Sequence, residues 1–187
     1  AAVSIPSATF NDNCPGGVIT NDYNGGGADA SDTYPVGTTI VEFTATDASG
    51  NTDICTMTII ITDSEDPTIT CAADQTQTAD AGLCEAAVTV TGPTTNDNCG
   101  IASVTNDFNG TADASDTYPV GTTTVTWTVT DNAGNTASCS HDITVTDDED
   151  PLISCPADQT VNVDPGSCDA VIIIADATAS DNCPGVV

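Results

Sequence analysis

Hydrophobic and polar residues alternate along several short stretches of the chain. Between residues 122 and 130, Val125, Trp127 and Val129 occupy alternate positions, and threonines lie between them. The earlier stretch 38–46 has the same alternation. A period of two residues is typical of β-strands that bury one face. Because no stretch combines a helical period with capping residues, the pattern predicts an all-β protein.

Two of these strands are predicted to form a hairpin. The second strand places Cys139, His141 and Val145 on one face, and the turn 131–135, which contains Gly and Asn, joins it to the first. We interpret His141 and Trp127 as core residues, rather than as a metal ligand and a sugar-binding surface.

The chain repeats itself with a period of 84 residues. Residues 34–39 recur as 118–123, and residues 47–51 recur as 131–135. The tripeptide Asp-Asn-Cys occurs three times, ending at Cys14, Cys99 and Cys183. This phase predicts one complete module at 64–147, the C-terminal part of a truncated module at 1–63, and the N-terminal part of the next at 148–187. We expect the chain to be a window on a longer array.

Each module is expected to be an antiparallel β-sandwich. Short strands separated by turns of Gly, Asp, Asn and Pro are typical of a sandwich of about seven strands. One predicted strand buries Ala86, Val88 and Val90, and its copy is predicted at residues 170–174. A module of 84 residues buries limited apolar area, so disulfides are a reasonable supplement.

The charge of the chain excludes several classes of partner. It has 28 acidic residues and no Lys or Arg, for a formal net charge of -28. Two like charges at 4 Å repel by about 1 kcal/mol in water and about 4 kcal/mol at an effective dielectric near 20. Such a chain lacks the cationic surface that nucleic acid requires and is repelled by anionic membranes. No apolar run has transmembrane length. A compact fold therefore favours bound cations where carboxylates cluster.

The nine cysteines indicate an oxidising compartment. They form no Cys-x-x-Cys pairs, and the chain has a single His, so a zinc site is disfavoured. A disulfide framework is the better interpretation, and it predicts an extracellular or cell-surface location.

The sequence contains no recognisable catalytic arrangement. Neither a Gly-x-Ser-x-Gly nor a His-Glu-x-x-His motif is present. Paired carboxylates can cleave glycosides, but here they recur every 84 residues in loops, which suits a structural role. We predict that the chain is not an enzyme.

The combined motifs resemble the hyalin repeat, or HYR module, an immunoglobulin-like domain. They are Cys-Pro-Ala-Asp at 155–158, Asp-Asn-Cys-Gly at 97–100, Tyr-Pro-Val-Gly-Thr-Thr at 118–123 and Asp-Asn-Ala-Gly-Asn at 131–135. Ala72 departs from the pattern, because Pro156 fits the Cys-Pro of the family better. The resemblance implies tandem modules with an adhesive role in extracellular proteins, such as giant bacterial surface adhesins. The absence of Lys and Arg suggests a specialised stalk or filament.

The resemblance also implies a pairing of the cysteines. Related modules with two cysteines keep the outer pair, and the first and last strands of such a sandwich commonly run parallel, which favours Cys71–Cys139. The remaining pair is then Cys84–Cys99, with Cys168–Cys183 as its copy. An extended strand would hold Cys84 and Cys99 too far apart, so this bond requires the chain to double back near residue 93. The alternative is Cys71–Cys99 with Cys84–Cys139. Partners outside the chain are expected for Cys14, Cys55 and Cys155.

Three acidic segments are expected to meet at one end of a module. They are the linker 63–67, the loop 96–98 and the turn 131–135. Calcium takes six to eight oxygen ligands, which carboxylates, Asn side chains and backbone carbonyls supply. The residues predicted to bind Ca²⁺ here and at the next boundary are Asp63, Glu65, Asp66, Asp97, Asn98, Asp131, Asp147, Glu149, Asp150 and Asp181. The alternative is that these side chains only stabilise turns. That interpretation is favoured for a second acidic loop, which contains Asp107, Asp113 and Asp116.

Three functions are compatible with these features. The first is a structural and adhesive repeat of an extracellular stalk, stapled by disulfides and stiffened by calcium. Its partners would be neighbouring repeats and an unknown surface or glycan ligand. The second is a carbohydrate- or protein-binding accessory module of a secreted enzyme, which would need an exposed aromatic surface. The third is a fibre in which copies of the array pack side by side.

Overall fold

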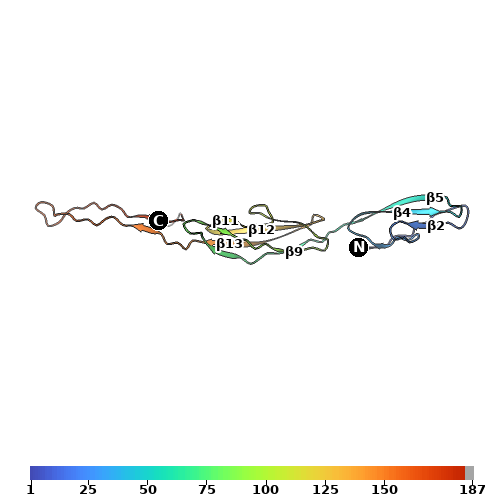
Figure 1. The fold of residues 1–187 in the computed structure, drawn as a ribbon, viewed down its shortest axis with the longest axis horizontal. Helices are drawn as coiled ribbons and strands as arrows, with labels where there is room; N and C mark the ends of the chain where they lie inside the picture. The colour runs from blue at the N-terminus through green and yellow to red at the C-terminus, as the bar shows by residue number, and fades with distance from the viewer. Residues whose placement is uncertain (184–187) are drawn as a thin grey trace. The chain divides into compact units, whose positions relative to one another are not determined.

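The computed structural model describes residues 1–183 and contains only strands, turns and loops in that range. Within it, no helix could cross a membrane. The chain divides into two compact units (Figure 1). The first unit is formed by residues 1–66, together with the loop 97–100 and the turn 131–135. The second is formed by residues 67–96, 101–130 and the chain from Thr136 onward. The predicted all-β class is confirmed.

The first unit is built on a three-stranded sheet. Strand β4 (Gly37–Thr46) pairs antiparallel with β2 (Val18–Asn21) and with β5 (Thr52–Ile61). A short antiparallel pair joins β1 (Ala2–Val3) to β3 (Asp32–Thr33). Its buried core consists of Ile5, Ala30, Tyr34, Val41, Phe43 and Ile59. Val41 and Phe43 are therefore inward, as their alternation predicts.

The second unit contains a four-stranded sheet in the order β10-β12-β13-β7. These strands are Ile101–Asn106, Gly121–Asp131, Thr136–Thr146 and Gln75–Thr78. Strands β12 and β13 form the predicted hairpin, and β7 runs parallel to β13. The remaining antiparallel pairs are β8 (Glu85–Val88) with β11 (Asp116–Pro119), β6 (Thr68–Thr70) with β9 (Thr94–Asn96), and β14 (Leu152–Ser154) with β15 (Thr178–Ser180).

The core of the second unit follows the predicted alternation. Val125, Trp127 and Val129 are fully buried on β12. Trp127 lies edge-on to His141 of β13, with ring centroids 6.4 Å apart and an interplanar angle of 75°. His141 is 4% exposed, so its interpretation as a core residue is confirmed. The prediction that residues 170–174 form a copy of strand β8 is wrong. Ile172 and the residues around it form no strand and are exposed.

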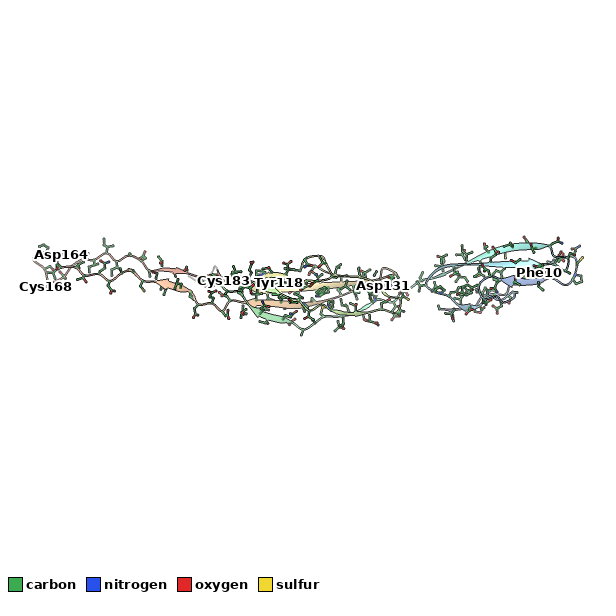
Figure 2. All side chains as sticks on the ribbon, in the orientation of Figure 1. Phe10, Tyr118, Asp131, Asp164, Cys168 and Cys183 are labelled. Atoms are coloured by element: carbon green, nitrogen blue, oxygen red, sulfur yellow. A yellow bond between two sulfur atoms is a disulfide. The ribbon has the colours of Figure 1, made fainter. Side chains whose placement is uncertain are left out.

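A buried tyrosine closes the loop before β11. The hydroxyl of Tyr118, whose side chain is labelled in Figure 2, donates a 2.7 Å hydrogen bond to the carbonyl oxygen of Ala114. Both residues are fully buried. The ring of Tyr118 stacks on Phe108 with centroids 4.3 Å apart. Tyr34 makes the same bond to the carbonyl of Ala30 in the first unit. Each repeat thus fixes this loop with one tyrosine.

We expect Tyr118→Phe to lower the unfolding free energy of the second unit by about 1–3 kcal/mol, because the buried Ala114 carbonyl loses its donor. Urea denaturation followed by circular dichroism measures this loss. Tyr23→Phe is the control, since its hydroxyl donates to Thr33 at an exposed position, and it should cost less than about 0.5 kcal/mol. Equal losses in the two variants would contradict the role of the buried bond.

Two disulfides lie within the second unit. One joins Cys71 and Cys139, with Cα atoms 5.8 Å apart, as the preferred pairing predicted. The parallel pairing of β7 with β13 places the start of the module beside its last strand, which accounts for this bond. The second bond joins Cys84 to Cys183, 99 residues later, with Cα atoms 4.9 Å apart.

The second bond corrects the predicted pairs Cys84–Cys99 and Cys168–Cys183. Cys99 and Cys168 are exposed and carry free thiols in the described structure. The physical reason is that the segment from Cys84 to Cys99 does not double back into a tight hairpin near Pro93. It contains β8 and β9, which pair with different partners, β11 and β6. The alternative pairs Cys71–Cys99 and Cys84–Cys139 are excluded by the same two bonds.

Candidate metal centre

The carboxylate of Asp131 organises the turn between β12 and β13. Its Oδ1 accepts hydrogen bonds from the backbone N–H groups of Ala133, Gly134 and Asn135 at 2.9, 2.6 and 2.8 Å. Its Oδ2 accepts one from Nδ2 of Asn135 at 2.7 Å. Burial raises the pKa of Asp131, but these hydrogen bonds from Asn135, Gly134 and Ala133 outweigh it, and the pKa lies below its usual value. A buried negative charge is therefore held at the turn at neutral pH.

Two further carboxylates approach Asp131. Ligand oxygens of Asp63, Asp97 and Asp131 all lie within 4.8 Å of one another, and all three residues belong to the first unit. They come from the three segments that the sequence predicted to meet, the linker 63–67, the loop 96–98 and the turn 131–135. We call these three residues the Asp cluster.

The Asp cluster contains two carboxylate oxygens without a protein partner. Oδ1 of Asp63 accepts the N–H of Glu65 at 3.2 Å, and Oδ2 of Asp97 accepts the N–H of Cys99 at 2.7 Å. The other oxygens, Oδ2 of Asp63 and Oδ1 of Asp97, are buried and have no hydrogen-bond partner among residues 1–183. A buried, unpaired carboxylate oxygen is costly, and a cation removes that cost.

The chemistry of the Asp cluster fits a hard divalent cation. All available ligand atoms are carboxylate oxygens, which Ca²⁺ prefers. The sulfur of the nearby Cys99 is not among the ligand atoms that gather at this point. No Lys or Arg exists to neutralise the three charges. The donor set therefore excludes the thiolate sites that zinc commonly occupies.

The other predicted ligands at this boundary have different roles. Oε2 of Glu65 accepts a hydrogen bond from Nδ2 of Asn98 at 2.9 Å, which ties the linker to the loop. Asp66 is exposed. Asn135 was not among the predicted ligands, yet its Nδ2 also donates to the carbonyl of Glu65 at 3.1 Å. Its signal in the sequence is the matching Asn51 at the end of the earlier turn.

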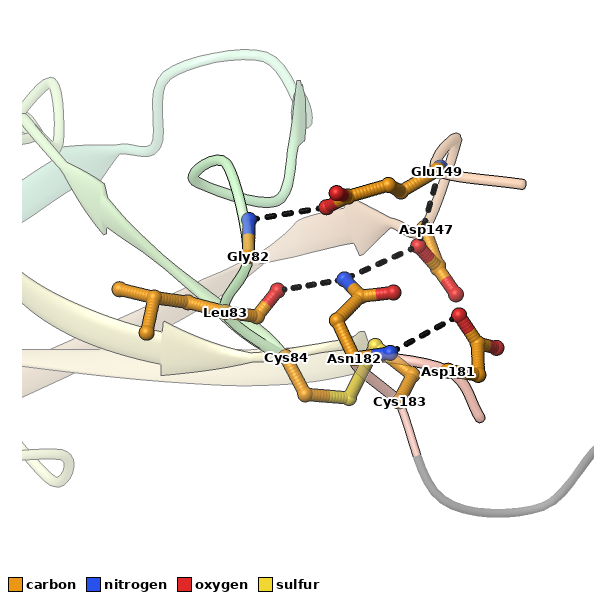
Figure 3. Close-up of a disulfide and its surroundings, with 8 residues drawn as sticks. All are labelled: Gly82, Leu83, Cys84, Asp147, Glu149, Asp181, Asn182 and Cys183. Atoms are coloured by element: carbon orange, nitrogen blue, oxygen red, sulfur yellow. Dashed lines mark hydrogen bonds between the residues drawn. A yellow bond between two sulfur atoms is a disulfide. The ribbon is translucent and has the colours of Figure 1, made fainter. Parts of the chain in front are cut away.

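The next repeat boundary has part of the same arrangement. Asp147 and Asp181 are the 84-residue counterparts of Asp63 and Asp97, and the counterpart of Asp131 falls beyond residue 187. Oδ1 of Asp147 accepts the N–H of Glu149 at 3.2 Å and Nδ2 of Asn182 at 3.5 Å (Figure 3). Oδ1 of Asn182 is buried without a hydrogen-bond partner in the described range. These residues do not form a three-residue cluster, and Asp150 is exposed.

The carboxylates of the second acidic loop accept hydrogen bonds from backbone N–H groups. Asp107 accepts the N–H of Thr126, Asp113 that of Ser115, and Asp116 that of Thr117, each at 2.8 Å. Asp113 and Asp116 thus stabilise the local backbone, as the preferred interpretation held, whereas Asp107 ties the loop to strand β12. The three carboxylates do not form a cluster.

These features define a class of protein, a tandem array of disulfide-bonded, immunoglobulin-like β-modules with acidic boundaries. Within that class, the chain belongs to the HYR domain family, whose model matches residues 3–61 and 62–145. The matched segments cover both copies of the 84-residue motif set. The predicted HYR modules are thus confirmed.

Two relatives are named hyalin. The chain is 35% identical over 156 residues to hyalin of Strongylocentrotus purpuratus, covering 80% of the chain and 13% of that protein. It is 34% identical over 155 residues to hyalin of Lytechinus variegatus, covering 80% of the chain and 29% of that protein. The chain therefore spans less than a third of either relative. These are sea-urchin proteins, and the bacterial adhesin that the resemblance implied stays a prediction.

Solved structures give a weaker likeness. A protocadherin gammaB7 EC3-6 structure aligns with 98% of this chain and 52% of that chain, at 12% identity and a TM-score of 0.39.

Proposed function

We propose that this chain is a structural and adhesive repeat of an extracellular stalk or filament, with Ca²⁺ bound at the repeat boundaries. The observation that carries this proposal is the Asp cluster, with its two unpaired buried oxygens in a chain without Lys or Arg. Its members come from three segments that are far apart in the sequence. A cation shared by them would hold the linker against the loop and the turn.

The repetition of acidic residues supports a structural role for the cation. Asp63 and Asp97 have counterparts in Asp147 and Asp181, so two of the three carboxylates return at the next boundary. An ion at each boundary would neutralise charge where the chain is most crowded with carboxylates. The stalk would then be stiff in calcium-containing surroundings and looser without calcium.

Location and partners follow from the same features. Two disulfides favour an oxidising, extracellular environment. The expected partners are neighbouring repeats, further copies in a fibre, and a surface or glycan ligand, and no catalytic role is proposed. The alternative, a carbohydrate- or protein-binding accessory module of a secreted enzyme, would need an exposed aromatic surface. Trp127, Tyr34 and Tyr118 are completely buried, and Phe10 is the one aromatic among the exposed large hydrophobic residues of the described chain, which is too little for such a surface.

Calcium is expected to stabilise the protein against unfolding. A free Ca²⁺ concentration 100 times the dissociation constant raises the unfolding free energy by about 2.7 kcal/mol. Thermal unfolding in calcium and in excess EGTA measures this difference, and isothermal titration gives the stoichiometry. Asp97→Asn should remove most of the calcium-dependent stabilisation, because it replaces a charged ligand whose Oδ1 has no protein partner.

Asp116→Asn is the matched control for this measurement. It removes the same charge from an exposed position that accepts only the N–H of Thr117 in the described structure, so the calcium effect should be retained. If both variants respond to calcium like the original chain, the Asp cluster is not the binding site. Unchanged unfolding on chelation of the original chain would overturn the calcium proposal.

A further inference from the structure

The Cys84–Cys183 disulfide connects two consecutive repeats in the sequence. Cys183 is the counterpart of Cys99 in the 84-residue frame, because both end an Asp-Asn-Cys tripeptide. The bond therefore joins the Cys84 position of one repeat to the Cys99 position of the next repeat. Cys168 is the counterpart of Cys84.

Hydrogen bonds surround this disulfide on both sides (Figure 3). Nδ2 of Asn182 donates to the carbonyl of Leu83 at 2.9 Å, and the N–H of Gly82 donates to Oε2 of Glu149 at 2.8 Å. Cys183 is 9% exposed. Asn182, directly before Cys183, and Glu149 of the linker after β13 thus both hold the turn preceding Cys84 by hydrogen bonds that do not involve the sulfur atoms.

We propose that these disulfides form a continuous covalent strap along an array of such modules. In each repeat the strap follows the chain from the Cys84 position to the Cys99 position. At the Cys84 position a disulfide leads to the following repeat, and at the Cys99 position a disulfide leads to the preceding repeat. Cys99 and Cys168, whose thiols are free here, are the places where the strap would continue. Each bond forms when two thiols lose two protons and two electrons to a disulfide oxidant, which is reduced to two thiols.

The strap limits how far an array can lengthen under tension. The 15 residues from Cys84 to Cys99 span at most roughly 50–55 Å, whereas the 84 residues of a whole repeat span roughly 280–300 Å. Strands β8 and β9 already hold part of this segment in extended conformation. An unfolded module would therefore add little length, because the strap carries the load past it. This inference rests on the proposed role as a stalk and is independent of calcium.

Single-molecule stretching of the 187-residue chain, attached at its two ends, tests the strap. Free thiols are alkylated first. In the original chain the load crosses Cys84–Cys183, which removes a separation of 99 residues from the path. In Cys84→Ser/Cys183→Ser the load instead crosses Cys71–Cys139, with a separation of 68 residues. The fully extended length should increase by 31 residues (99 minus 68), roughly 100–110 Å.

The matched control is Cys71→Ser/Cys139→Ser. It also removes one disulfide, but the shortest covalent path does not cross that bond, so the extended length should stay unchanged. This holds even if the module folds less well, because the length is measured on the unfolded chain. Full reduction should add 99 residues, roughly 330–360 Å.

Two results would overturn the strap. One is an unchanged length in Cys84→Ser/Cys183→Ser. The other is a longer chain in Cys71→Ser/Cys139→Ser, which is the expected result if Cys84 pairs with Cys99. Loss of cation binding in EGTA leaves the covalent path as it is, so failure of the calcium proposal is distinguished from failure of the strap.

Discussion

Trp127→Ala is expected to lower the unfolding free energy of the second unit by about 3–5 kcal/mol. Trp127 is completely buried and belongs to a cluster with Ala86, Tyr118 and Ile143. Truncation to alanine removes the largest side chain of that core and leaves a cavity that neighbouring strands cannot fill without breaking their pairing. Urea denaturation followed by far-UV circular dichroism is the suitable measurement, because Trp127 is the single tryptophan of the chain.

Trp127→Phe is the matched variant, since Phe43 occupies the same position in the first repeat. Its cost should be about 1–2 kcal/mol, less than that of alanine. The indole Nε1 is buried without an acceptor in the described structure, so phenylalanine also removes an unpaired donor, which offsets part of the lost packing. If Trp127→Ala lowers the unfolding free energy by less than about 1 kcal/mol, Trp127 does not make the main packing contribution to this core.

Cys71→Ser/Cys139→Ser is expected to destabilise the second unit by about 3–4 kcal/mol. The bond closes a separation of 68 residues, and opening it increases the conformational entropy of the unfolded chain. The Cys84–Cys183 bond stays in place and still restricts part of that chain. The change is measured as a shift of the urea midpoint under non-reducing conditions.

The control for this prediction is Cys55→Ser/Cys155→Ser. These residues are the 84-residue counterparts of Cys139 and Cys71, but both have free, exposed thiols in the described structure. The same atoms are changed without opening a bond, so the midpoint should move by less than the equivalent of about 0.5 kcal/mol. Equal shifts in the two double variants would show that the effect comes from serine and not from the disulfide.

The local features of the fold could be predicted because they depend on neighbouring residues. Alternation placed Val125, Trp127 and Val129 inward, and the Gly-Asn turn defined the β12–β13 hairpin. The strand predicted at residues 170–174 failed for a non-local reason. Its counterpart β8 pairs with β11, whereas residues 170–174 pair with no strand among the described residues.

Long-range partners were harder to predict. Within the 84-residue repeat, Cys99 was the predicted partner of Cys84. The structure instead pairs Cys84 with Cys183, in the following repeat. Acidic composition located the three segments of the Asp cluster, but it did not predict which carboxylates in them accept hydrogen bonds and which are left free to bind a cation. Whether a carboxylate oxygen has a donor, as in Glu65 with Asn98, or has none, as in Asp63, depends on side-chain geometry.

The 99-residue separation of Cys84 and Cys183 also sets an order of events during synthesis. A chain made from its N-terminus at about 5–20 residues per second exposes Cys84 roughly 5–20 s before Cys183. Throughout that interval Cys99 is the nearer thiol. The strands between Cys84 and Cys99, β8 and β9, pair with β11 and β6, and all four strands precede Cys183 in the chain. The strands of the module can therefore pair before the sulfur that links it to the next repeat has been made.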